Sequence, residues 1–208
     1  PAHTAFVPYD TEEKALARSE EDSAYYQLLN GDWAFQYADK PADRNTEFFK
    51  EDYDVSDWDT IQVPGNWQTQ GYDKPIYSNS TYPWTMNGGG SADTTNATAP
   101  TSYNPVGSYR RSFTVKPEML EGGRQIFISF QGVESAFYLW INGQQVGYSE
   151  DSYTPADFNI TPYLHEGENS VSVQVYRWSD GSYMEDQDFI RLSGIFRDVY
   201  LLFRPQAH

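Results

Sequence analysis

Carboxylates are concentrated in one connection of this chain, between two segments whose residues are typical of β-strands. The connection is YRWSDGSYMEDQDFIRLSGIFRDV, residues 176–199, and it contains Asp180, Glu185, Asp186 and Asp188 among aromatic residues. Hydrolysis of a glycosidic bond uses two carboxylates, roughly 5 Å apart when the anomeric configuration is retained. Glu185 and Asp188 are therefore candidates for such a pair.

A structural role explains the same acids without any chemistry. Under this interpretation Asp180 caps a turn and the next two acids face solvent, while Asp188 accepts hydrogen bonds or pairs with Arg191 or Arg197. The residue types alone favour the structural interpretation, and both interpretations stay open at this point.

Other catalytic arrangements have little support in the sequence. The three histidines are His3, His165 and His208, two of them at or near the chain ends, so neither a histidine metal cluster nor a Ser-His-Asp triad is predicted. Cysteine is absent, which excludes disulfides, thiolate metal sites and a cysteine nucleophile. The cellular compartment stays open, with a cytoplasmic location favoured over an exported one.

The charge balance excludes two classes of partner. The chain has 30 acidic against 14 basic side chains, a formal net charge of −16, which repels nucleic-acid phosphates and anionic lipid headgroups. We therefore predict no nucleic-acid and no membrane partner. No run of eighteen apolar residues and no basic-then-apolar leader is present, so the sequence predicts neither a membrane span nor an export signal.

Short segments of alternating or apolar residues recur along the 208-residue chain, with Gly, Pro and Asn between them. The strongest short hairpin signal is Asn142-Gly143. No long helical period competes with this pattern. The predicted strands are 32–37, 60–63, 108–115, 125–130, 136–141, 146–148, 158–160, 170–176 and 199–203.

This spacing predicts an all-β fold, a two-sheet antiparallel jelly-roll β-sandwich. We expect an extended N-terminal arm at 1–29, which includes one short helix, and a sandwich domain at 30–208 with a long surface loop at 86–105. Aromatic residues make up 17% of the chain. We place most of these rings in the core, among them Trp140 and Trp178.

Five long segments, taken in order, resemble the N-terminal sugar-binding domain of the bacterial β-galactosidases of glycoside hydrolase family 2. The resemblance covers nearly the whole chain and implies a jelly-roll fold like that of galactose-binding domains. The main departure from the family pattern is the loop at 86–103, which is longer and richer in Gly and Thr. The segments are LNGDWAFQY (29–37), VPGNWQTQGYDKPIYSNSTYPW (63–84), NPVGSYRRSF (104–113), GVESAFYLWINGQQVGYSEDSYTPADFNIT (132–161) and RWSDGSYMEDQDFIRLSGIFRDVYL (177–201).

The resemblance implies that the catalytic acids lie elsewhere. In this family a later (β/α)₈-barrel domain carries the general acid/base and the nucleophile, both Glu, and no such barrel fits in 208 residues. The resemblance then assigns no catalytic residue to this chain and places a magnesium ion in the missing barrel domain. Glu185 and Asp186 become structural, with Arg191 and Arg197 as their partners.

The resemblance assigns two substrate-binding residues. Asn79 matches the asparagine of the Pro-Ile-Tyr-x-Asn segment, which touches galactose. Asp188 matches the last acid of Glu-Asp-Gln-Asp, which contacts the galactosyl hydroxyls and binds sodium. The chemistry fits, because Asn offers a donor and an acceptor, Asp offers two acceptors, and Na⁺ is a hard ion that prefers oxygen ligands.

The leading hypothesis is therefore one part of a retaining β-galactosidase. Its partners would be β-galactosides such as lactose and the remaining domains of the same polypeptide, with a homo-oligomer as the full-length form. The alternative is a free-standing carbohydrate-binding module. Binding of galactosides by the chain on its own separates the two hypotheses, because a domain that holds one wall of a shared site binds them very weakly.

Overall fold

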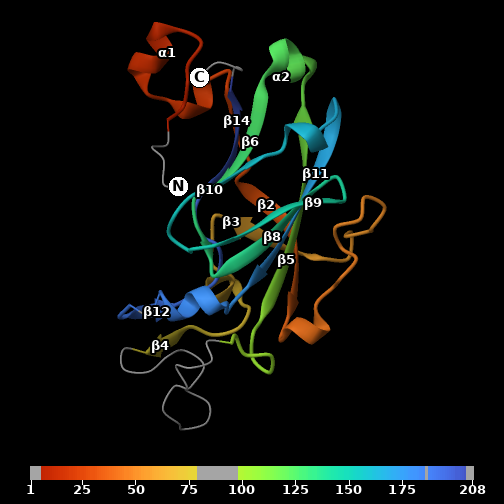
Figure 1. Ribbon diagram of the computed structural model, residues 1–208, viewed down its shortest axis with the longest axis vertical. Coiled ribbons are helices and arrows are strands. Elements are labelled where there is room, and N and C mark those ends of the chain that lie inside the picture. The colour runs from red at the N-terminus through yellow and green to blue at the C-terminus, as the bar shows by residue number, and fades with distance from the viewer. Residues whose placement is uncertain (1–5, 79–97, 186, 205–208) are drawn as a thin grey trace.

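Two antiparallel sheets form the body of the protein (Figure 1). The structure is a computed structural model that describes residues 6–78, 98–185 and 187–204. The four-stranded sheet has the order β1 (Tyr26–Leu28), β14 (Val199–Arg204), β6 (Gln125–Phe130), β10 (Ala156–Asn159). The six-stranded sheet has the order β3 (Asp59–Val63), β2 (Gly31–Ala38), β5 (Val106–Val115), β11 (Gly167–Tyr176), β8 (Ala136–Ile141), β9 (Gln144–Glu150).

Two short antiparallel ribbons lie outside these sheets. One pairs β4 (Ile76–Ser78) with β12 (Phe189–Arg191), and the other pairs β7 (Val133–Glu134) with β13 (Gly194–Ile195). In Figure 1 the β4–β12 ribbon extends from one end of the sandwich. It therefore forms a separate small element that carries the end of the acidic connection.

Helical segments are short and lie between the strands. Neither α-helix of the described ranges has the length and apolar character needed to cross a membrane. The segments are α1 (Glu12–Ala17), η1 (Glu20–Asp22), η2 (Pro41–Asp43), η3 (Trp67–Gln70), α2 (Pro117–Leu120), η5 (Glu121–Gly123), η6 (Thr161–Tyr163) and η7 (Asp180–Tyr183), where η marks a 3₁₀-helix.

The core lies between the two large sheets and follows from the period of two in each strand. On β11, Val171, Val173 and Val175 are fully buried in it, while the residues between them face the other side of the six-stranded sheet. On β14, Val199, Leu201 and Phe203 contribute from the opposite sheet. Burial of this apolar surface is the main force that stabilises the sandwich.

The predicted all-β antiparallel sandwich is confirmed. Strands 125–130 and 136–141 have the predicted bounds, and the hairpin after β8 turns at Asn142 and Gly143, both with positive φ (47° and 73°), as a type I′ turn requires. The sheet also includes β1, which lies within the segment expected as an arm and pairs with β14. The division into arm and domain stays a prediction, as does the loop at 86–105, of which 86–97 lie outside the described residues.

The prediction that Trp140 and Trp178 are buried is confirmed, and the structure corrects where they pack. Both are buried (9% and 3% exposed), yet neither belongs to the cluster between the sheets. Leu139 and Ile141 face that cluster, so alternation turns Trp140 to the outer face, where it stacks on Phe49 at 5.0 Å between ring centroids. An apolar run shows that a ring is buried but does not show on which face of the sheet.

Candidate functional site

The β4–β12 ribbon brings together the two segments that the sequence marked as substrate-binding. Its register pairs Ser78 with Phe189 and Tyr77 with Ile190, and Asp188 directly precedes β12. The Tyr77 hydroxyl donates a 2.8 Å hydrogen bond to Oδ1 of Asp188. The pKa of Tyr77 is raised, because this bond to a carboxylate stabilises the neutral phenol. Asn79 follows Ser78 in the sequence and lies outside the described residues.

Asp188 is exposed, and no ion pair reaches it within the ranges that the structure describes. The proposed structural pair with Arg191 or Arg197 is therefore not observed among those residues. The Arg197 guanidinium donates to the backbone oxygens of Gln131 and Tyr153 instead. Within the described ranges, the hydrogen bond to the Asp188 carboxylate is the one that Tyr77 donates.

Arg191 shapes the backbone that leads to Asp188. It is buried (2% exposed), and its guanidinium donates to the backbone oxygens of Glu185 and, at 3.2 Å, of Gln187. The same guanidinium lies 4.5 Å from the centre of the Phe189 ring, a favourable cation–π distance. The residues on either side of Asp188 are thus held by one side chain.

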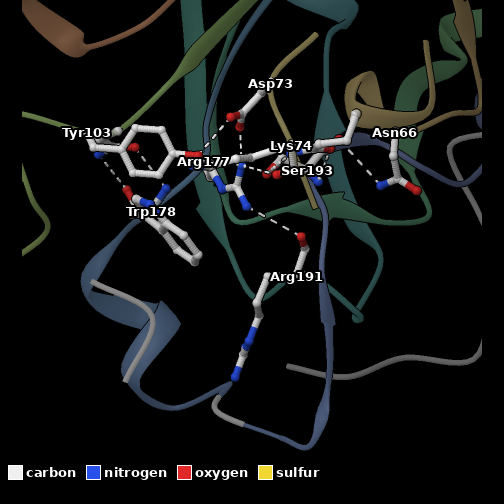
Figure 2. A network of polar contacts seen from close by, with 10 residues as sticks. Asn66, Asp73, Lys74, Tyr103, Arg177, Trp178, Arg191 and Ser193 are labelled. Carbon is white, nitrogen blue, oxygen red and sulfur yellow. Dashed lines mark hydrogen bonds and ion pairs between the residues drawn. The ribbon is translucent and has the colours of Figure 1, made fainter. Parts of the chain in front are cut away.

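A second buried arginine ties the ribbon to the rest of the protein. The Arg177 side chain is fully buried and forms an ion pair with Asp73. It also donates to the backbone oxygens of Lys74 (2.9 Å) and Arg191 (3.4 Å). Figure 2 shows this guanidinium between Asp73 and Lys74, which precede β4, and the backbone of β12. One cation thereby fixes both strands of the ribbon.

Neighbouring side chains hold Arg177 in turn. The Tyr103 hydroxyl donates to Asp73 at 2.7 Å and accepts from Arg177 at 3.1 Å (Figure 2). The guanidinium lies 5.0 Å from the centre of the Trp178 ring. Asn104 closes the arrangement, because its amide exchanges hydrogen bonds with the backbone nitrogen and oxygen of Trp178. The buried positive charge of Arg177 is therefore paired with a carboxylate and hydrogen-bonded, as a buried charge must be.

The other side of the ribbon is fastened through Ser193. Its backbone oxygen accepts from the Asn66 side chain at 3.4 Å, drawn in Figure 2, and from the backbone of Trp67 at 3.1 Å. Its backbone nitrogen donates to Gln68 at 2.9 Å. Segments 66–74 and 191–193 are thus joined at several points, which limits how far Asp188 can move relative to the sandwich.

The Glu185 carboxylate is hydrogen-bonded to Ser152. One carboxylate oxygen accepts from the Ser152 backbone nitrogen and the other from its hydroxyl, at 2.5 and 2.7 Å. Arg191 was predicted as a partner of Glu185, and it contacts the Glu185 backbone oxygen, whereas the carboxylate accepts from Ser152. Asp186 lies outside the described residues. Because Glu185 and Asp188 serve different partners, nothing in the geometry favours them as a catalytic pair.

Glu134, which the sequence did not single out, is a buried acid close to Glu185. Burial is the main cause that raises its pKa to about 8, and the charge of Glu185 adds to the rise, while Arg191 and Arg177 oppose it. The side chain is 8% exposed. In the folded protein this carboxyl group therefore holds its proton at a pH where the unfolded chain has released it.

The stability of the chain should consequently depend on pH through Glu134. Between its ordinary value of 4.5 and about 8, the folded state binds one more proton than the unfolded state, so stability falls as pH rises. The slope is at most about 1.4 kcal/mol per pH unit. We expect Glu134→Gln to raise Tm at pH 8 and to have little effect at pH 4.5. A shift of equal size at both pH values in thermal melts would contradict an ionising Glu134.

The described residues contain no cluster of three or more acidic, His or Cys side chains suited to a metal ion. Asp188 supplies one exposed carboxylate, with one oxygen engaged by Tyr77. A carboxylate oxygen suits a hard cation such as Na⁺, but one such group is a small part of a coordination shell. The donor type fits sodium, and the remaining ligands must come from other groups.

Comparison with known proteins identifies the family. Residues 26–205 match the model of the glycosyl hydrolases family 2 sugar binding domain. The chain belongs to this family. It is 55% identical over 207 residues to a beta-galactosidase of Priestia megaterium and 50% identical over 208 residues to one of Halalkalibacterium halodurans. All of the chain is covered in both cases, against 19% and 20% of the relatives, so it spans about a fifth of their length.

Solved structures of family 2 enzymes have the same fold. A beta-glucuronidase of Bacteroides uniformis is 25% identical with a TM-score of 0.63, over 86% of this chain and 18% of that one. The family resemblance stated from the sequence is therefore confirmed. Two residues around the site, Tyr77 and Arg177, were not predicted. The sequence did contain a signal for Arg177. This arginine directly follows the apolar segment of β11, and a charge that is buried there requires a partner.

Proposed function

We propose that this chain is the N-terminal domain of a retaining β-galactosidase that hydrolyses terminal β-D-galactosyl residues. The observation that carries the proposal is the β4–β12 ribbon, which presents Asp188 outward at a fixed position next to the segment that leads to Asn79. The beta-galactosidase relatives at 45–55% identity support this choice over other activities of the family.

The surface around Asp188 is suited to a partner domain. Large apolar side chains are exposed there: Tyr77 at 55%, Ile190 at 56% and Met184 at 84%. Tyr77 and Ile190 face each other across the ribbon. Such side chains gain stability when another surface covers them. In the proposed enzyme, the covering surface is the later barrel domain with the two catalytic glutamates and the magnesium ion.

In this arrangement the chain binds and orients substrate, and it supplies no acid, base or nucleophile. Asp188 accepts hydrogen bonds from galactosyl hydroxyls, and Asn79 both donates and accepts. A sodium ion at Asp188 would supply a positive charge opposite the carboxylate and would bind the oxygens of the hydroxyls. Tyr77 holds the carboxylate in place through its 2.8 Å bond.

The test compares the 208-residue chain with the longer polypeptide that contains it, on chromogenic galactoside and glucuronide substrates. We expect the longer protein to hydrolyse the galactoside and to prefer it over the glucuronide, and the chain alone to hydrolyse neither. Turnover by rigorously purified chain that is lost in Glu185→Gln would contradict the proposal and restore the local carboxylate pair. A preference for the glucuronide would point to the activity named for the structural neighbour.

A further inference from the structure

The outer face of the six-stranded sheet carries a group of aromatic side chains that the proposed function does not use. On β8, Tyr138 pairs with Tyr148 of β9 and with Gln174 of β11, and Tyr176 lies two residues further along β11 on the same face. The Tyr138 ring centre is 4.7 Å from that of Tyr148 and 6.0 Å from that of Tyr176. The three rings therefore form one continuous surface.

The remainder of this face is covered by the segment at 41–58. Phe49 stacks on Trp140, and the Arg110 guanidinium donates to the backbone oxygens of Phe48, Glu51 and Tyr53 at 2.9–3.0 Å. Beside the tyrosines lies a cavity of about 530 Å³, which Arg44 of this segment and residues 98–101 also line. We call it the tyrosine pocket; the lining residues used below are Arg44, Tyr138, Tyr148, Tyr176, Trp178 and Asp180.

The rings of the tyrosine pocket are held in place before any ligand arrives. The Tyr176 hydroxyl donates to Gln174 at 2.9 Å, and the Tyr148 hydroxyl donates to Glu150, whose other oxygen accepts from the Gly181 backbone. Tyr148 nevertheless stays 41% exposed. Rings that are already fixed lose little conformational entropy when a ligand packs on them, so the surface is prepared for binding.

The lining combines aromatic rings, tilted relative to one another, with separated polar groups. Arg44 offers N–H donors and Asp180 offers carboxylate acceptors, while the tyrosine rings supply apolar surface. Glu150 adds a second carboxylate beside Tyr148, and the chain has a net charge of −16, which disfavours phosphorylated or otherwise anionic ligands. The volume lies in the range of ordinary small-molecule sites.

We propose that the tyrosine pocket is a second binding site, for a pyranose unit of a neutral saccharide. The C–H face of the sugar packs on the rings of Tyr138 and Tyr148, and its hydroxyls exchange hydrogen bonds with Arg44 and Asp180. This site is distinct from the one at Asp188, and it does not depend on the proposed galactosidase activity. It would retain an oligosaccharide or a polymer near the enzyme.

The test is titration of the 208-residue chain with a thio-linked galactobioside, which resists hydrolysis, followed by calorimetry and by saturation-transfer NMR. We expect measurable binding by the parent chain, at least about fivefold weaker binding by Tyr148→Ala, and near-parental binding by the matched variant Tyr148→Phe. Asp180→Asn is a second test of the pocket and should also weaken binding. Because Asp180 is exposed, this change should have little effect on folding. Asp52→Asn, an exposed acid outside the pocket, serves as the control and should bind as the parent does, while Asp188→Asn separates binding at the β4–β12 ribbon from binding in the tyrosine pocket.

Three results would overturn the proposal. The first is no binding by the parent chain at millimolar ligand. The second is equal binding by the parent, Tyr148→Ala and Asp180→Asn. The third is loss of binding in Asp188→Asn, which would assign the ligand to the β4–β12 site. Because the tyrosine pocket would let the chain alone bind galactosides, the hydrolysis assay, and not this titration, decides between a galactosidase domain and a free-standing module.

Discussion

Replacement of Asp188 by Asn in the longer enzyme is expected to lower kcat/KM for a chromogenic galactoside by roughly ten- to a hundredfold, the worth of a hydrogen bond to a charged group. Part of the loss should be recovered at high Na⁺ concentration. The change keeps the shape of the side chain and removes the charge closest to the ion. Activity titrated with Na⁺ for parent and variant measures the effect.

The same change in the 208-residue chain should leave stability within about 0.5 kcal/mol of the parent, because Asp188 is exposed and Asn can still accept the Tyr77 hydrogen bond. Asp52→Asn, another exposed acid, is the matched control and should leave both activity and sodium response unchanged. A chain that loses stability while the enzyme keeps its sodium response would assign Asp188 a structural role and remove it from the site.

Replacement of Arg177 by Met should destabilise the chain by about 3–5 kcal/mol, because it leaves the buried Asp73 carboxylate without its cation. Urea unfolding measures the loss. Arg177→Lys should recover only part of it, since one ammonium group cannot reproduce the contacts with Asp73, Lys74 and Arg191.

A double-mutant cycle identifies the source of that loss. Asp73 has a positive φ of 57°, a conformation that Asn tolerates, so Asp73→Asn removes the charge with little backbone strain. The double variant should be more stable than Arg177→Met alone, because no unpaired charge remains. An Arg177→Met chain that unfolds at the parental urea concentration would show that the ion pair does not hold the ribbon.

Strands of six or more residues could be predicted from the sequence, because each is a run of apolar, aromatic or β-branched residues long enough to recognise. β6 (QIFISF) and β8 (AFYLWI) are examples, and every position in them is buried or half-buried. The two- and three-residue strands β1, β4, β7, β12 and β13 were missed, since a period of two cannot be recognised over so short a length. The pairing of β4 with β12 could therefore not be predicted from the sequence and is seen only in the structure.

The candidate site, like the fold, was predictable in part. Asp188 was singled out through resemblance, whereas its contact with Tyr77 and the contact of Arg177 with Asp73 join residues 111 and 104 positions apart. No local pattern encodes such partners. The buried state of Trp178 could be predicted from its apolar neighbours, but its place over a guanidinium could not, because that depends on how two distant loops meet.

The β4–β12 ribbon has a consequence for the order in which the protein gains and loses structure. Its three residue pairs close a long loop and leave Tyr77 and Ile190 exposed, so little apolar burial repays the entropy of closure. The buried Arg177–Asp73 pair, whose guanidinium also reaches the backbone of Arg191, therefore does most to keep the two strands together. Loss of that pair should let the ribbon open locally while the sandwich stays intact, and any group that bridges the two strands should slow their amide hydrogen exchange.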